Sequence, residues 1–326
     1  MKRSSRIASV LLLLSVLIVV GYGLLNVRGI LDYVALRNYS PPQEVSALAD
    51  NTTMSEQTRR VFYVNHPRLQ QKPEFAKSCT QQEETIVLGC YVQNDGIYLL
   101  IVNDQRLDGI VEVTAAHEVL HAMYDRLSES ERARVDRLTA EAFAGLNNQR
   151  IKDNIENYKK RDPLVVPNEL HSILGTEVAS LPKELEDYYS RYFTNRQAVV
   201  GLLSKYESTF VGLENQAKAL DARLKVLKDS LDKNEAELGS LGKEIDAERT
   251  ELDSLLSSGS ISEYNARVAG FNALVNRYNA LVKERQIEVV EYNRLVEDFN
   301  TIATTEAQLY DSLKSSPSPI EPQTRN

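Results

Sequence analysis

Two histidines and a glutamate fall within five consecutive residues, His117-Glu118-Val119-Leu120-His121, in a chain with four histidines. On a helix, side chains at positions i and i+4 project from the same face, so both imidazoles would face one point. Two imidazoles so placed suit a tetrahedral Zn²⁺ site, and the carboxylate of Glu118 can accept a proton from water that the metal activates. The spacing therefore predicts a zinc site with a general base beside it.

The residues around this pentad are apolar at helical spacing. The apolar positions recur every three or four residues: Val113, Ala116, Leu120, Met123 and Leu127. An exposed polar helix, the alternative interpretation, would lack such a stripe. We therefore expect a helix that is buried along one side, with Asp108 as its N-cap.

A catalytic zinc site needs a third protein ligand and keeps its fourth position for water. The residues after His121 have no histidine at the metzincin spacing, so a carboxylate on a later helix is expected. Glu169 and Glu177 both lie in a helix predicted for residues 168 to 180. Glu177 would project among apolar side chains, where a carboxylate is costly unless it is paired or metal-bound. The two lie about 12 Å apart by helical rise, so only one of them can bind the metal.

The pentad and residues 168 to 178 resemble the zincin metallopeptidases, specifically the thermolysin-like gluzincins. In those enzymes the third ligand lies in an Asn-Glu-x-x-Ser-Asp sequence on a helix. This chain reads Asn-Glu-Leu-His-Ser from residue 168, with Ile173 in place of the aspartate. That aspartate normally orients a ligand histidine, so the departure affects how the site is held. The resemblance favours Glu169 as the third ligand, and Glu177 stays open as the alternative.

The resemblance also implies roles for other residues. Glu118 would be the general base that carries a proton from water to the leaving amine of a peptide or protein substrate. Residues 97 to 102 would form an edge strand on which an extended peptide pairs its backbone. His171 or Tyr158 would donate a hydrogen bond to the oxyanion. His66 lies far upstream of the pentad, and we expect it to be a surface or packing residue.

The N-terminus has the pattern of a membrane anchor. Lys2, Arg3 and Arg6 precede an uncharged run, residues 7 to 26, that is rich in leucine, valine and isoleucine. An apolar core of about 19 residues is long enough to cross a bilayer as a helix. The basic residues before it predict a single-pass protein of the cell membrane, with its N-terminus in the cytoplasm and the remainder outside. A cleaved signal peptide ending near Gly21 or Gly23 is the alternative.

The two cysteines indicate the cellular compartment, and the net charge indicates which kinds of partner are excluded. Cys79 and Cys90 would form a disulfide outside the cytoplasm, closing a short loop. A cysteine-zinc site would need two more ligands that this segment does not offer. The net charge is −8 and no basic cluster lies beyond the N-terminal residues, which argues against a nucleic-acid partner.

The central part of the chain predicts a mostly helical α+β domain over residues 51 to 200, after an anchor at residues 1 to 27 and a tether at residues 28 to 50. Residues 85 to 92 and 97 to 102 are β-rich and flank a tight-turn sequence, so a hairpin is expected. The expected helices after the pentad cover residues 129 to 145, 150 to 160, 168 to 180 and 183 to 194.

Residues 201 to 313 carry two heptad seams joined by a Ser-Ser-Gly-Ser turn at residues 257 to 260. The first seam is broken by two polar positions, Asn234 and Glu248, and in the second Arg285 takes one aromatic position. The second seam repeats an aromatic followed by asparagine, at Tyr264, Phe271, Tyr278, Tyr292 and Phe299, with valines between them at Val268, Val275, Val282, Val289 and Val296. Such seams predict an antiparallel coiled-coil hairpin in which Asn234 and Arg285 share one layer. Residues 314 to 326 hold three prolines and are expected to be disordered.

Together these patterns predict a membrane-anchored zinc metallopeptidase that acts outside the cytoplasm. One alternative is an inactive zincin-like protein that acts as an adaptor and binds a protein partner through its coiled coil. Another is a different metal-dependent hydrolase built on the same ligands.

Overall fold

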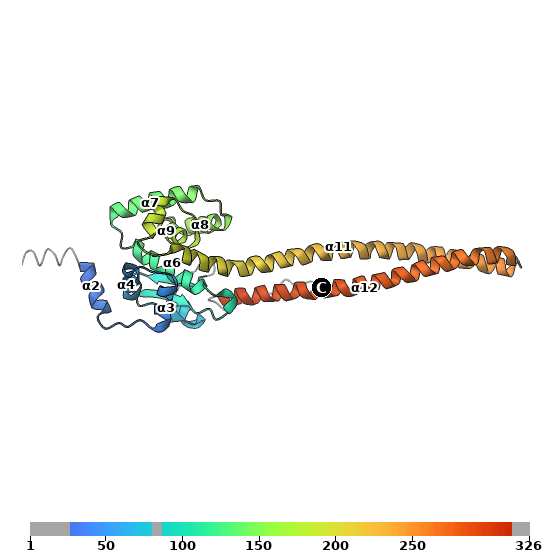
Figure 1. The fold of residues 1–326 in the computed structure, drawn as a ribbon, viewed down its shortest axis with the longest axis horizontal. Helices are drawn as coiled ribbons and strands as arrows, with labels where there is room; N and C mark the ends of the chain where they lie inside the picture. Colours follow the sequence, from blue (N-terminus) through green and yellow to red (C-terminus); the bar gives the residue numbers. More distant parts are fainter. Residues whose placement is uncertain (1–26, 80–86, 315–326) are drawn as a thin grey trace, which may run out of the picture. The chain divides into compact units, whose positions relative to one another are not determined.

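The computed structural model describes residues 27 to 79 and 87 to 314 (Figure 1). It is mostly helical, with a small three-stranded sheet and a long C-terminal helical hairpin. The described chain divides into unit 1, residues 27 to 209 with 311 to 314, and unit 2, residues 210 to 310. Among the described helices, none combines the length and hydropathy that a bilayer crossing requires. The predicted membrane span and almost all of the predicted disordered tail lie outside the described residues.

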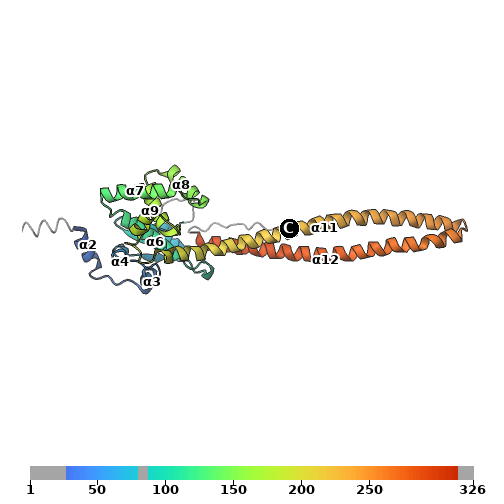
Figure 2. The same cartoon turned by 45° about the horizontal axis from the view of Figure 1, so that its top comes forward.

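The helices of unit 1 are α2 (Val27–Leu36), α3 (Gln43–Asn51), α4 (Glu56–Val64), α5 (Lys72–Ser78), the 3-10 turn η1 (Gln105–Leu107), α6 (Ile110–Tyr124), α7 (Glu129–Ala144), α8 (Gln149–Arg161), α9 (Val166–Glu177), α10 (Lys183–Tyr189) and the start of α11 (Arg196–Ser257). Helix α6 lies in the middle, with α7, α8 and α9 on one side and α3 and α4 on the other (Figures 1 and 2). The predicted tether is helical, and Val45, Leu48 and Ala49 of α3 belong to the core.

Local sequence explains where these helices begin. Ser128 and Glu131 form a reciprocal capping box at the start of α7, and the side chain of Asn148 caps α8. The expected cap of α6 was wrong. The backbone turns through Gly109 (φ +100°) directly before α6, so Asp108 lies one residue too early and its carboxylate pairs with Lys205 instead, at 3.4 Å.

The sheet contains β1 (Arg68–Gln70), β2 (Gly89–Val92) and β3 (Gly96–Leu100) in the order β1-β3-β2. Strands β2 and β3 form the predicted antiparallel hairpin. The expectation that residues 97 to 102 form an edge strand was wrong, because β1 pairs in parallel with the other side of β3. All five residues of β3 are buried, as is usual for a central strand.

The predicted disulfide is present. Cys79 follows α5 and is bonded to Cys90 of β2, with a Cα–Cα distance of 5.9 Å. Both cysteines belong to a small apolar cluster with Phe75 and Tyr98. His66 packs edge-on against Tyr39 at a ring-centroid distance of 4.5 Å, which agrees with its predicted packing role.

Unit 2 is the predicted antiparallel hairpin of α11 and α12 (Ile261–Leu313), which run side by side in Figures 1 and 2 and turn at Gly259. The predicted register is confirmed: Asn234 donates to Glu288 at 2.8 Å, and Arg285 pairs with Glu235 at 3.4 Å. Asn234 and Arg285 thus share a layer, but the direct partner of Asn234 is Glu288.

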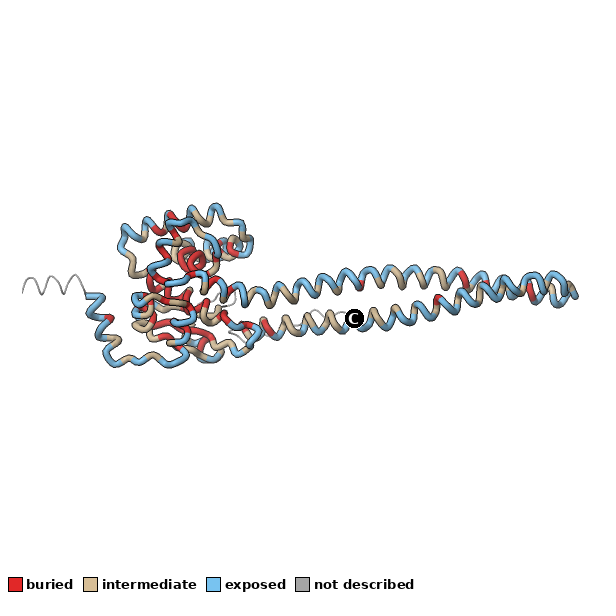
Figure 3. The backbone as a smooth tube through the Cα atoms, in the orientation of Figure 1, coloured by how far each residue is buried: buried red, intermediate tan, exposed pale blue. Residues whose placement is uncertain are grey.

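Burial along α12 differs from the predicted seam in one respect. Figure 3 shows only scattered buried positions along the two helices. The buried residues of α12 are Leu309, Leu313, Leu281 and Leu295. Leu281 and Leu295 each lie one residue before a predicted seam valine, while Val289 is exposed. Leucine buries more apolar area than valine, which favours the leucines in the seam. Glu288 occupies the equivalent position between them.

The polar layer of the hairpin generates a test. Replacing Asn234 with leucine leaves the Glu288 carboxylate facing an apolar side chain, with Ser230 as its remaining donor in this layer. We expect the local free energy of opening to fall by about 1 kcal/mol in Asn234→Leu. In the double variant Asn234→Leu with Glu288→Leu, the local free energy of opening should be higher than in the wild type, because two apolar side chains then pack against each other. Native-state hydrogen exchange of residues 227 to 241 measures both changes.

The control is Asp229→Leu, which alters an exposed position on the same helix. It should leave the exchange of residues 227 to 241 close to that of the wild type. A single Asn234→Leu variant that is more stable than the wild type would contradict a polar layer at this place.

Candidate metal centre

Helix α6 is almost entirely buried, and the exceptions include the two histidines of the pentad. Of its 15 residues, 11 are buried, and the other four are Val111, Glu112, His117 and His121. The imidazoles of His117 and His121 keep 18% and 12% of their surface accessible. They lie on one face of α6, one turn apart, with a ring-centroid distance of 4.8 Å. The predicted geometry of the pentad is therefore present.

Helix α9 carries the carboxylate that completes this group. It comes close to α6 at Gly175, where an added Cβ would lie 2.5 Å from Leu120 Cδ1. This approach brings Glu169 to the histidines, with 3.8 Å from its Oε2 to His117 Nε2 and 3.9 Å from its Oε1 to His121 Nε2. One ligand atom from each of the three residues lies within 4.8 Å of the others.

Two polar side chains of α9 orient His121. Its Nδ1 lies 3.0 Å from Asn168 Oδ1 and 3.2 Å from Ser172 Oγ. An amide oxygen only accepts hydrogen bonds, so a proton on Nδ1 would complete the contact with Asn168 and would leave Nε2, on the side of Glu169, available to a metal. Asn168 thus orients the His121 ring, a role that the sequence pattern did not predict. Its place directly before Glu169 was the available signal.

The charges and hydrogen bonds of Glu169 fit a cation. Burial raises the pKa of Glu169, but His121, His117 and Arg161 more than offset this, so its pKa lies below the usual range. Its Oε2 is buried and has no hydrogen-bond partner among the described residues. Two imidazole nitrogens and one carboxylate oxygen are a usual zinc set, for which tetrahedral geometry needs separations of about 3.4 Å. Small side-chain movements would therefore let these residues hold Zn²⁺.

Glu118 lies on α6 against strand β2. It is buried, and a Cβ added to Gly89 would lie 2.9 Å from its Cγ and 2.5 Å from Thr114 Cγ2. Only a glycine at position 89 lets the strand pass this closely. The predicted general base is therefore next to a ligand histidine in the chain and next to an outer strand of the described sheet in space.

The second carboxylate, Glu177, lies apart from the histidines. It is the last residue of α9, and its Oε2 forms an ion pair with Arg150 at 2.8 Å. It is therefore a structural carboxylate, which is the role expected for whichever of the two glutamates did not join the cluster.

His171 does not have the position expected of an oxyanion donor. It is fully buried, its Nε2 is hydrogen-bonded to the Tyr188 hydroxyl at 2.8 Å, and aromatic rings surround it. The neighbouring rings are those of Tyr124, Tyr188, Tyr189 and Tyr192. The other predicted donor, Tyr158, lies on α8 with the Arg161 guanidinium 5.1 Å from its ring centroid. Arg161 is also one of the charges that lower the pKa of Glu169.

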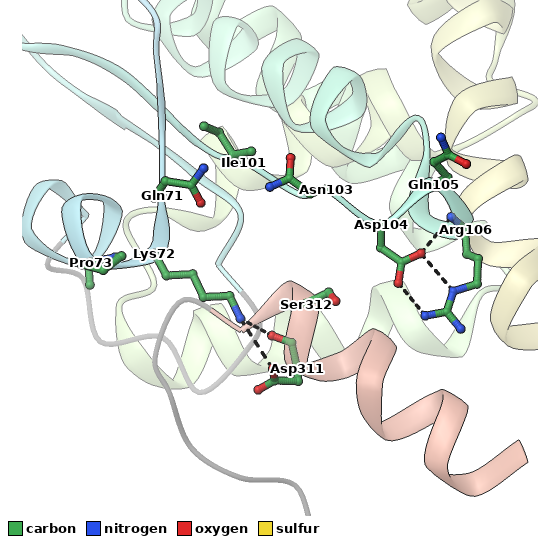
Figure 4. A pocket seen from close by; sticks show the side chains of 11 residues that line it. Gln71, Lys72, Pro73, Ile101, Asn103, Asp104, Gln105, Arg106, Asp311 and Ser312 are labelled. Carbon is green, nitrogen blue, oxygen red and sulfur yellow. Dashed lines mark hydrogen bonds and ion pairs between the residues drawn. The ribbon is translucent and has the colours of Figure 1, made fainter. Parts of the chain in front are cut away.

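A cavity of about 990 Å³ lies elsewhere in unit 1 (Figure 4). Its lining includes Gln71, Lys72, Asn103 and Arg106, and it contains no residue of the histidine–glutamate group. Lys72 donates a hydrogen bond to the carbonyl of Asp311 across it. The cavity is therefore separate from the candidate metal centre.

The chain matches no protein-family model, no curated protein and no solved structure at a significant level. The evidence for the candidate metal centre is therefore the geometry of His117, His121, Glu169 and their neighbours.

Asn168 provides the first test of this centre. In Asn168→Ala, His121 loses the acceptor that holds its Nδ1 proton, so we expect zinc affinity to fall by about 10- to 100-fold. Asn168→Asp keeps an acceptor at the same place and should bind zinc at least as tightly as the wild type. Competition with a chromophoric chelator measures both. Undiminished affinity in Asn168→Ala would show that this hydrogen bond does not hold the site.

His171 predicts a pH dependence of stability. Burial, followed by the nearby His121 and His117, lowers the pKa of His171 to about 3, against about 6.5 in an unfolded chain. Between these values the unfolded chain binds the extra proton. The neutral His171 therefore makes its full contribution to the free energy of unfolding above pH 6.5. This contribution is lost as the pH falls below 6.5, by about 1.4 kcal/mol per pH unit.

We expect the free energy of unfolding to drop by about 2 kcal/mol more between pH 6.5 and pH 5 in the wild type than in His171→Phe. Urea unfolding followed by tyrosine near-ultraviolet circular dichroism, with a chelator present, gives this difference. The metal-ligand histidines are common to both proteins and cancel. Equal pH dependence in the two proteins would mean that His171 does not titrate across this range on unfolding.

Proposed function

We propose that this protein is a zinc-dependent metallopeptidase whose metal is held by His117, His121 and Glu169. The observation that carries the proposal is the convergence of these side chains, with a buried Glu169 oxygen that has no hydrogen-bond partner among the described residues. The adjacent Glu118 supplies the acid-base group that peptide hydrolysis needs.

The roles of the protein side chains follow from their positions. When bound, zinc supplies a Lewis acid that polarises a scissile carbonyl and acidifies water. Asn168 and Ser172 hold the His121 ring with its Nε2 directed at the centre. Glu118 accepts a proton and then delivers it to the leaving amine. Burial of Glu118 against strand β2 limits the movement of its carboxylate.

The sheet suggests how a peptide substrate lies. Strand β2 pairs on one side with β3, is an outer strand of the described sheet, and passes next to Glu118 at Gly89. An extended peptide that adds to β2 by backbone hydrogen bonds would bring a carbonyl close to the metal centre. We therefore assign to β2 the substrate-pairing role that the sequence had suggested for residues 97 to 102.

The setting that we propose is the outer side of the cell membrane. The uncharged run at residues 7 to 26, preceded by basic residues, supports a membrane anchor. The disulfide between Cys79 and Cys90 supports an oxidising compartment.

An adaptor function is the second candidate, and exposed apolar residues of the hairpin favour it. Val226, Ile287 and Val290 are among the most exposed large apolar residues of unit 2. Exposed apolar residues mark contact with a partner protein where they form a contiguous patch. If Glu118→Gln kept the cellular function and Ile287→Lys lost it, the adaptor function would replace the peptidase.

The peptidase proposal predicts separate effects on metal and on activity. His117→Ala and His121→Ala should each abolish stoichiometric zinc binding, because two ligands do not hold a catalytic zinc. Glu118→Gln should keep the zinc and lower the rate of peptide cleavage by about 10²- to 10⁴-fold, because the proton carrier is gone. Zinc content by elemental analysis and cleavage of a peptide library measure the two properties.

Glu112→Gln is the matched control, since Glu112 lies on the same helix and is hydrogen-bonded to Asn51. It should retain both zinc and activity. Stoichiometric zinc in the double variant His117→Ala with His121→Ala, or unchanged cleavage by Glu118→Gln, would contradict the assignment.

A further inference from the structure

Helix α2 has its polar side buried and its apolar side exposed. Its one buried residue is Asp32, at 7% exposure. Its apolar residues Val27, Ile30, Leu31 and Val34 follow the i, i+3, i+4, i+7 spacing of a single stripe and are 44%, 49%, 61% and 63% exposed. A helix packed on a protein core in water normally has the opposite arrangement.

Polar contacts hold α2 to the rest of unit 1. The Asp32 carboxylate accepts two hydrogen bonds from Arg126, at 2.7 Å from Nη1 and 3.0 Å from Nη2. Arg28 donates to the carbonyl of Arg126 at 3.3 Å. A bidentate pair of this kind fixes direction as well as distance. The orientation of the stripe is therefore set by the protein.

The sequence before α2 indicates what covers the stripe. The uncharged run ends at Asn26, immediately before the first residue of α2. If this run enters a bilayer, the first turn of α2 lies at the level of the lipid headgroups. Arginine at both ends, Arg28 and Arg37, and Tyr33 beside the stripe suit that interface.

We propose that α2 lies along the surface of a lipid bilayer, with Val27, Ile30, Leu31 and Val34 inserted at the boundary between headgroups and acyl chains. The Asp32–Arg126 pair fixes the rest of unit 1 to this helix. Arg126 follows α6 closely and is five residues after His121, so the candidate metal centre is held at a constant distance from the membrane. This proposal does not depend on the peptidase chemistry.

The absence of tryptophan from the chain makes a direct test possible. The full-length protein carrying Val34→Trp is reconstituted in phosphatidylcholine–phosphatidylglycerol vesicles with brominated acyl chains. The control is Leu164→Trp, at a position that is 88% exposed in the same unit. We expect a blue-shifted emission from Val34→Trp and quenching by bromine at least threefold greater than in the control.

Two results would overturn the lipid contact. Quenching equal to that of Leu164→Trp would place the stripe in water. A blue shift without bromine quenching would mean that protein covers the stripe, either residues 7 to 26 of this chain or a second protein.

The role of the ion pair is tested separately, with energy transfer from Leu164→Trp to dansyl-labelled lipid. Asp32→Asn combined with Arg126→Gln removes both charges without leaving one unpaired. We expect energy transfer to fall by at least half, because unit 1 is no longer fixed to α2, while Val34→Trp remains quenched in the same background. Arg134→Ala, which removes an exposed ion pair with Glu184, should change neither signal. Unchanged energy transfer in the double variant would show that the pair does not fix unit 1 at the membrane.

Discussion

The close contact between α6 and α9 is the interaction on which the candidate metal centre depends. Gly175 makes it possible, because any side chain there would meet Leu120 of α6 and Tyr189 of α10. The contact places one turn of α9 over the histidines, so that Glu169 reaches both imidazoles while Asn168 holds the ring of His121. A single helix thus supplies the carboxylate of the group and the side chain that orients one of its imidazoles, and both depend on the same packing.

This arrangement concentrates polar groups in a part of the core where they are costly. His171, Ser172 and Thr176 of α9 are buried. Local bonds satisfy several of these groups: Thr176 donates to the carbonyl of Ser172, and the Tyr189 hydroxyl donates to that of His171. Folded proteins leave few buried polar atoms unpaired. The buried Glu169 Oε2 has no hydrogen-bond partner among the described residues and lies 3.8 Å from His117 Nε2, an arrangement that a bound cation would complete.

The hairpin of unit 2 is stabilised in a different way from the packed core of unit 1. Its two helices bury narrow stripes and leave most of their surface in water, so the free energy of the hairpin is spread over many weak layers. A polar layer costs stability, but Ser230 and Asn234 can meet Glu288 in only one register. In unit 1 the corresponding specificity comes from close packing around α6, including the two glycines at positions 89 and 175.

The sequence by itself determined the features that depend on spacing along one segment. These include the one-face placement of His117 and His121, the hairpin around the turn at residues 93 to 96, the disulfide, and the antiparallel register of α11 and α12. Periodicity and turn chemistry act over a few residues, so they can be recognised without knowing the fold. Pairing between distant segments cannot. Only the tertiary structure placed Glu169 rather than Glu177 beside the histidines, because both lie on α9 and the choice depends on where that helix crosses α6. It also made β3 central by adding β1, and it brought Asn168 to the ring of His121. Strand neighbours and hydrogen-bond partners of this kind are decided by packing in three dimensions.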